Sequence, residues 1–80
     1  MYLTDQKTIY TIMNEYGEKT TISINKDIAD FLHEKFTDVH KFIQETYNRV
    51  VKNHPKWKRL TQGDEVRRIA ADTTLGDVEF

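Results

Sequence analysis

The chain has 80 residues, which is enough for one domain and too few for two separate hydrophobic cores. Its formal net charge of -1 gives no overall attraction to nucleic acid or membrane, and the lack of cysteine excludes a disulfide scaffold, a thiolate metal site and a cysteine nucleophile. No apolar run approaches the roughly 20 residues of a membrane span, and because no apolar segment of the signal-peptide kind follows Lys7 we expect no signal peptide. We therefore expect a cytoplasmic protein with no membrane partner.

The first part of the chain predicts strands. Residues 8–14 are rich in β-branched and aromatic side chains, and residues 19–24 form a second such segment after a turn at Gly17. In the second segment one face carries Lys19, Thr21 and Ser23, and the opposite face carries Thr20, Ile22 and Ile24. The first segment is either a flexible arm or a strand that pairs with the second.

Helical patterns follow the second strand. Asn25 occupies the position of an N-cap and precedes an apolar stripe at helical spacing, and Thr37-Asp38 gives a second N-cap signature before another stripe. Pro55 ends this region, because proline disfavours helical geometry at the residue before it. The two stripes are in phase and no glycine or proline separates them. Two helices with a tight turn and one continuous helix are therefore both open.

Charge is unevenly distributed along the chain. Residues 46–63 contain no acid and carry five basic side chains, namely Arg49, Lys52, Lys56, Lys58 and Arg59. Such a segment either contacts phosphates or forms a solvated helix end, where basic residues also complement the helix dipole. Trp57 lies within it, either as a plug in the core or as a stacking platform. Thr61 is a candidate cap for a last helix over residues 62–71, and an acidic tail follows it.

These elements predict an α+β fold, mostly α, with a short N-terminal strand or hairpin followed by two to three helices. We assign residues 1–54 to a strand–helix–helix core. We assign residues 55–80 to a short helix and an acidic tail that form a candidate partner-binding segment.

Residues 19–51 resemble the ribbon-helix-helix family of DNA-binding proteins. The resemblance rests on Lys-Thr-Thr-Ile-Ser-Ile-Asn-Lys-Asp-Ile-Ala-Asp-Phe-Leu and, further on, Thr-Asp-Val-His-Lys-Phe-Ile-Gln-Glu-Thr-Tyr-Asn-Arg-Val-Val. It implies an intertwined homodimer in which two chains pair one strand each into a ribbon that enters the major groove.

The resemblance also implies that residues 1–54 bind DNA and form the dimer, and it implies roles for particular residues. Lys19, Thr21 and Ser23 would contact bases. Thr37 and Val39 would contact a phosphate at the N-terminus of the second helix, and the five basic residues of 46–63 would contact further phosphates. The dimer core would contain Ile22, Ile24, Ile28, Phe31, Leu32, Phe42, Ile43 and Tyr47.

The sequence therefore predicts a small sequence-specific DNA-binding protein, which acts as a dimeric transcriptional repressor or as an antitoxin. Its partners would be double-stranded DNA, a second copy and a protein bound through residues 55–80, such as a toxin or an inhibited target. The alternative is a protein–protein interaction module or an inhibitor of phage or plasmid type, built on a hairpin and a long helix.

Little in the sequence indicates an enzyme. His33 and His40 lack the i, i+4 spacing of a helical metal pair, and the three glycines lie too far apart for a phosphate loop. A chain of this length can hardly build a catalytic cleft. We expect no catalytic residues, no metal and no cofactor.

Overall fold

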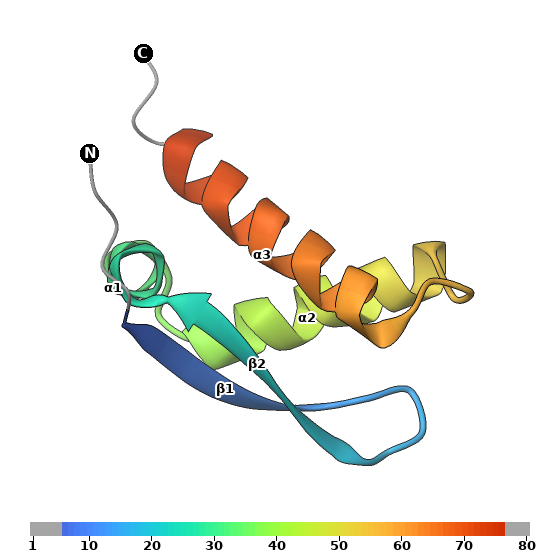
Figure 1. Cartoon of the computed structure of the whole chain (residues 1–80). Coiled ribbons are helices and arrows are strands. Elements are labelled where there is room, and N and C mark those ends of the chain that lie inside the picture. Colours follow the sequence, from blue (N-terminus) through green and yellow to red (C-terminus); the bar gives the residue numbers. More distant parts are fainter. Residues whose placement is uncertain (1–5, 77–80) are drawn as a thin grey trace.

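A β-hairpin followed by three helices makes up the computed structural model of the chain, which describes residues 6–76 (Figure 1). The elements in chain order are β1 (Lys7–Met13), β2 (Lys19–Asn25), α1 (Lys26–Lys35), α2 (Val39–Asn53) and α3 (Arg59–Gly76). α1 and α2 pack against the hairpin, and α3 packs across α1 and α2. The predicted α+β, mostly α fold is confirmed.

β1 is a paired strand and not an arm. It runs antiparallel to β2, with Tyr10 opposite Ile22 and Thr11 opposite Thr21. The turn between them places Gly17 at a φ of 77°, a conformation that glycine adopts without a steric penalty. The side chain of Asn14 accepts hydrogen bonds from the backbone of Tyr16 and Glu18 and so closes the turn. The strand lies one residue earlier than the predicted range.

α1 and α2 are separate helices. Asn25 caps α1 by accepting hydrogen bonds from the amides of Asp27 and Ile28, as predicted. The backbone leaves the helical conformation at Phe36 and becomes extended there. Asp38 then caps α2 by accepting a hydrogen bond from the amide of Lys41. Both helices bury their apolar stripes in the same core, although the chain turns between them.

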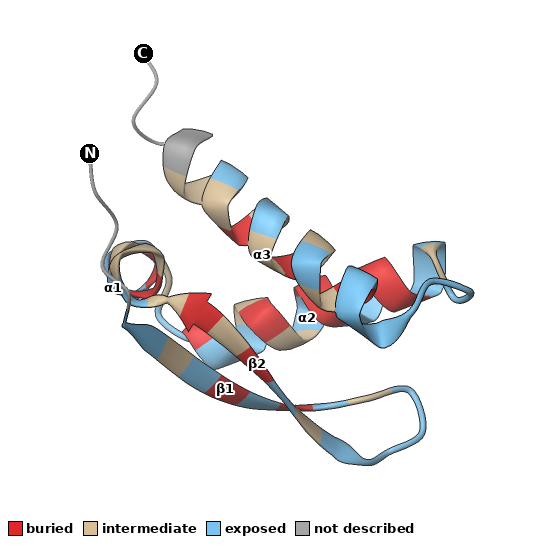
Figure 2. Cartoon of the chain, in the orientation of Figure 1, coloured by how far each residue is buried: buried red, intermediate tan, exposed pale blue. Residues whose placement is uncertain are grey.

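The core lies between the hairpin and the helices (Figure 2). The hairpin contributes its inner face, and each helix contributes small or branched apolar side chains. The fully buried members include Ile12, Ile24, Leu32, Ile43, Val39 and Val66. Val66 and Ala70 of α3 are both 0% exposed, so the core draws on residues from both sides of the predicted boundary at residue 54.

The region after α2 differs from its prediction. α2 ends at Asn53 before Pro55, as expected, but α3 begins at Arg59 and continues to Gly76, which makes it longer than the predicted range 62–71. The interpretation of Trp57 as a core plug is wrong. Its side chain is 39% exposed, and its ring stacks on that of His54 at a centroid distance of 3.6 Å on the loop surface.

Within residues 6–76 no helix has the length and apolar character needed to cross a membrane.

Candidate nucleic-acid interface

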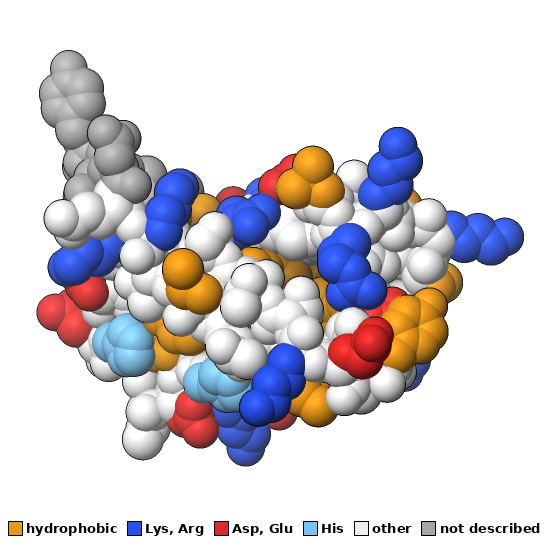
Figure 3. Space-filling model, turned by 60° about the horizontal axis from the view of Figure 1, so that its bottom comes forward, with side chains coloured by type: hydrophobic (Ala, Val, Ile, Leu, Met, Phe, Trp, Pro, Cys, Tyr) orange, Lys and Arg blue, Asp and Glu red, His pale blue; other side chains and the backbone are white. Residues whose placement is uncertain are grey.

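The hairpin turns one face away from the helices. We call this the outer face; its members alternate with the buried residues of each strand and are Lys7, Ile9, Thr11, Met13, Lys19, Thr21, Ser23 and Asn25. The set contains two lysines, four further polar side chains and no acid. Figure 3 shows this side of the molecule, where polar side chains and a few separate hydrophobic ones lie among basic, acidic and histidine side chains.

The predicted base-contacting residues all belong to this outer face, and the structure brings them together on β2. Lys19 and Thr21 are exposed. Ser23 is less exposed than these two residues, because Arg67 of α3 lies against it. Nε of Arg67 donates a hydrogen bond to the carbonyl oxygen of Ser23 at 2.8 Å. Lys19 and Thr21 are thus free to meet a ligand, while Ser23 is already partly engaged.

β1 adds residues that the sequence reasoning did not place on the interface. Thr11 lies directly opposite Thr21, and Met13 lies opposite Lys19. Ile9 is 67% exposed and Met13 is 44% exposed. The alternation of residues 8–14 carried this signal, but it becomes usable only once the segment is known to pair within the same chain.

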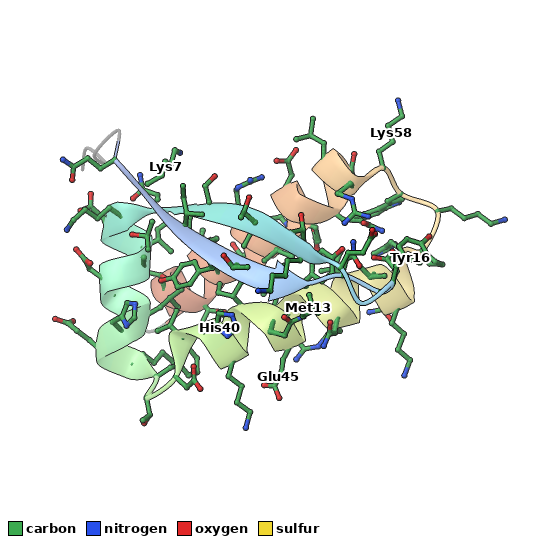
Figure 4. All side chains as sticks on the ribbon, turned by 90° about the horizontal axis from the view of Figure 1, so that it is seen from below. Lys7, Met13, Tyr16, His40, Glu45 and Lys58 are labelled. Carbon is green, nitrogen blue, oxygen red and sulfur yellow. The ribbon has the colours of Figure 1, made fainter. Side chains whose placement is uncertain are left out.

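The free edge of β1 is covered at Thr11 and Met13 by side chains of α2 (Figure 4). Gln44 accepts a hydrogen bond from the amide of Met13 through Oε1 at 2.8 Å and donates to the Met13 carbonyl through Nε2 at 2.9 Å. The Nε2 atom of His40 lies within hydrogen-bonding distance of the carbonyl oxygen of Thr11. Neither contact was predictable from the sequence, because each joins positions about thirty apart.

The basic residues of 46–63 gather at the end of the molecule that holds the hairpin turn. Arg49 and Lys52 belong to the second half of α2, Lys56 and Lys58 to the α2–α3 loop, and Arg59 to the start of α3, and all five are exposed. Figure 4 shows Lys58 and Tyr16, which belongs to the turn, at this same end.

A chain of hydrogen bonds fixes this end. Nη1 of Arg59 donates to the hydroxyl of Tyr47 at 3.1 Å, and that hydroxyl donates to the carboxylate of Glu15 at 3.2 Å. Burial raises the pKa of the Tyr47 phenol, and the negative charge of Glu15 raises it further, while Arg59 opposes the shift. Tyr47 therefore stays neutral and links the hairpin turn to α2 and α3.

Thr37 and Val39 lie elsewhere. They stand at the N-terminus of α2, while the basic residues lie beyond its C-terminal half; a 15-residue helix separates the two ends by about 21 Å at about 1.5 Å per residue. Val39 is 2% exposed, and the Asp38 carboxylate already accepts from the Lys41 amide. The structure therefore does not bring these two residues together with the other predicted phosphate contacts.

The predicted dimer core is largely occupied within one chain. Ile22, Ile24, Leu32, Ile43 and Tyr47 are buried by the chain itself, and Ile28, Phe31 and Phe42 are partly buried. Burial of the first five therefore requires no second copy.

Comparisons with protein-family models, with curated proteins and with solved structures found no match to this chain. Among the described residues, no group of three or more histidine, cysteine, aspartate or glutamate side chains is arranged to hold a metal ion.

Proposed function

We propose that this protein binds double-stranded DNA in a sequence-specific manner and acts as a cytoplasmic transcriptional repressor. The observation that carries the proposal is the outer face, a two-stranded ribbon whose outward side chains include Lys7, Lys19, Thr11 and Thr21 and no acid. The hairpin supplies this ribbon within one chain, so the reading face does not depend on strand pairing between two copies.

The dimensions of the ribbon suit the major groove. Paired strands lie about 4.8 Å apart, and the major groove, about 12 Å wide, admits a two-stranded ribbon. In this position Lys19 donates to the acceptor edge of a guanine, and the hydroxyl of Thr21 contacts either donors or acceptors. Ile9 and Met13 offer apolar contact to the methyl group of thymine.

The basic end then contacts the backbone. Arg49, Lys52, Lys56 and Lys58 are exposed and belong to the second half of α2 and the loop after it. Figure 4 shows Lys58 at the end of the molecule that holds the hairpin turn. Contacts of this kind hold a protein in register on the duplex without reading sequence, whereas the outer face provides discrimination. We propose that two copies occupy one site with twofold symmetry, as in a dimeric repressor. Their contact is not the two-chain ribbon that the resemblance implies, because β2 pairs with β1 of its own chain.

The test starts with the full chain and a pool of random duplexes, from which bound sequences are selected over several rounds. Affinities for the selected duplex and for a scrambled duplex are then measured by fluorescence anisotropy at several salt concentrations. The Lys19→Ala, Thr21→Ala double variant should lose at least about tenfold in discrimination, since each good base contact contributes about 1–3 kcal/mol. Lys41→Ala, at an exposed lysine beside the α1–α2 turn, is the matched control.

The basic end has a different signature. Arg49→Ala with Lys52→Ala should weaken binding to both duplexes about equally and reduce the salt slope by about two units, because each phosphate contact contributes close to one. Failure to enrich any duplex above the scrambled one, or unchanged discrimination in the Lys19 and Thr21 variant, would overturn the proposal. Sedimentation of the complex gives the number of copies per site.

A further inference from the structure

The two edges of the hairpin differ. In the ladder the amide of Asn14 donates to Glu18 and the amide of Lys26 donates to Gln6, so even-numbered residues of β1 form the hydrogen-bonded pairs. The N–H and C=O groups of Thr11 and Met13 therefore point away from β2, and those of Thr21 point away from β1, each toward the free edge of its own strand. On β1, side chains of α2 bind the carbonyl of Thr11 and both backbone groups of Met13, and on β2 Arg67 binds the carbonyl of Ser23. Within the described part of the chain, no side chain binds the backbone of Thr21 in this way.

A groove lies along the open edge of β2. Its volume is about 320 Å³, and it is lined by the Thr20–Thr21–Ile22 stretch of β2 and by the first turns of α3. Ile12 and Ile22 give it an apolar floor, and Leu60, which is 74% exposed, forms part of its α3 wall. An extended chain takes roughly 4.8 Å by 10 Å in cross-section and 3.3 Å per residue, so the groove accommodates about two residues.

The lining of the groove includes two basic side chains, Arg59 and Arg67, and no acidic one. Two carboxylates lie nearby: Asp64 pairs with Nη1 of Arg67 at 2.9 Å, and Glu15 accepts from the hydroxyl of Tyr47. Arg59 donates to Tyr47 through Nη1, so the guanidinium is held at the groove by a neutral partner.

We propose that this groove binds an extended peptide segment of a partner protein in which acidic and apolar residues alternate. The segment adds a third strand at Thr21, whose outward N–H and C=O pair with the peptide backbone. Its apolar side chains rest on Ile22 and Leu60, and its carboxylates face Arg59, because Arg67 already pairs with Asp64. This site shares Thr21 with the outer face: the peptide pairs with the backbone of Thr21, whose side chain belongs to the outer face.

The probe is a labelled synthetic peptide of alternating glutamate and valine, and a peptide of alternating lysine and valine is its control. Binding to the full chain is measured by fluorescence anisotropy. We expect the glutamate peptide to bind and the lysine peptide to bind at least about tenfold more weakly, because Arg59 repels it. Leu60→Asp, which places a carboxylate in the groove, should weaken the glutamate peptide by a similar factor.

Backbone pairing has its own readout. On peptide binding the amide proton of Thr21 should exchange with solvent at least about tenfold more slowly, since it gains a hydrogen-bond partner, while that of Met13, already bonded to Gln44, should change little. Binding without protection at Thr21 would overturn the strand addition. If the groove instead seats a second copy, the mass in solution rises with concentration, Thr21 is protected without peptide, and the proposal of a partner peptide fails.

A matched pair of variants separates this proposal from DNA binding. Leu60→Asp changes the groove and leaves the outer face intact, whereas Ile9→Asp changes the outer face and leaves the groove intact. Loss of peptide binding in the first variant alone supports the groove whatever the result with DNA. Equal loss of peptide binding in both variants would show that the peptide adheres to the hairpin by charge alone and would overturn the proposal.

Discussion

The carboxamide of Gln44 binds the backbone of Met13 in the way that a neighbouring strand would, accepting from its N–H and donating to its C=O. An exposed strand edge is otherwise a template for pairing with another chain. One side chain of α2 thus closes the edge of β1 at the position where the strand ends.

Gln44→Ala tests this capping role. We expect the free energy of unfolding to fall by about 1–2 kcal/mol, because two partly exposed hydrogen bonds are lost, and we expect the variant to self-associate through the opened edge. Urea unfolding followed by circular dichroism and sedimentation at increasing concentration measure the two effects. Glu45→Ala, at the exposed neighbouring position, is the control. A Gln44→Ala variant that matches the control in both measurements would contradict the role.

We expect the free energy of unfolding to fall at alkaline pH because of Tyr47. Burial and Glu15 hold its folded pKa above the ordinary tyrosine value, so the stabilisation is complete below about pH 10 and is lost as the pH rises through the folded pKa. Urea midpoints measured between pH 8 and pH 11.5 should therefore fall more steeply for the wild-type chain than for Tyr47→Phe. Glu15→Gln, which removes one cause of the shift, should give an intermediate slope. Equal slopes in all three chains would refute this account.

A third test concerns the N-terminal cap of α1. Asn25→Ala removes the acceptor for two amides at the start of α1 and should lower the free energy of unfolding by about 1 kcal/mol. Asn25→Asp keeps a side-chain acceptor and should restore most of the loss. Thermal unfolding by circular dichroism gives the comparison, and an aspartate variant no more stable than the alanine one would count against capping as the cause.

A fourth test concerns the packing of α3 in the core. Val66→Ala deletes two methyl groups from a side chain that is 0% exposed and should cost about 2 kcal/mol. Leu60→Ala, on the same helix but 74% exposed, should change stability by less than about 0.5 kcal/mol. Equal effects would mean that α3 does not share the core with the hairpin and the other helices.

Local signals predicted much of this fold. The caps at Asn25 and Asp38, the alternation of β2 and the end of α2 before Pro55 depend on residues within a few positions of each other, and the structure confirms them. The choice between arm and strand for residues 8–14 depended on pairing across the turn, which composition alone does not fix.

The contacts that shape the candidate sites were not predictable in this way. Arg67 with Ser23 and Gln44 with Met13 join residues that are 44 and 31 positions apart, and the identities of these polar side chains do not reveal their partners. The interpretation of Trp57 as a core plug was wrong for a related reason. A large aromatic side chain is usually buried, but here the ring of His54 covers one face of the indole on the surface loop.

The stack of Trp57 on His54 gives the chain an optical reporter of its own. This is the only tryptophan, and it lies between Lys56 and Lys58 on the loop that joins α2 to α3. Because the indole is already partly exposed in the folded chain, its emission is a weak measure of global unfolding. It is instead a label-free signal for any ligand that approaches the basic end, and it can separate binding there from events at the far end of α2.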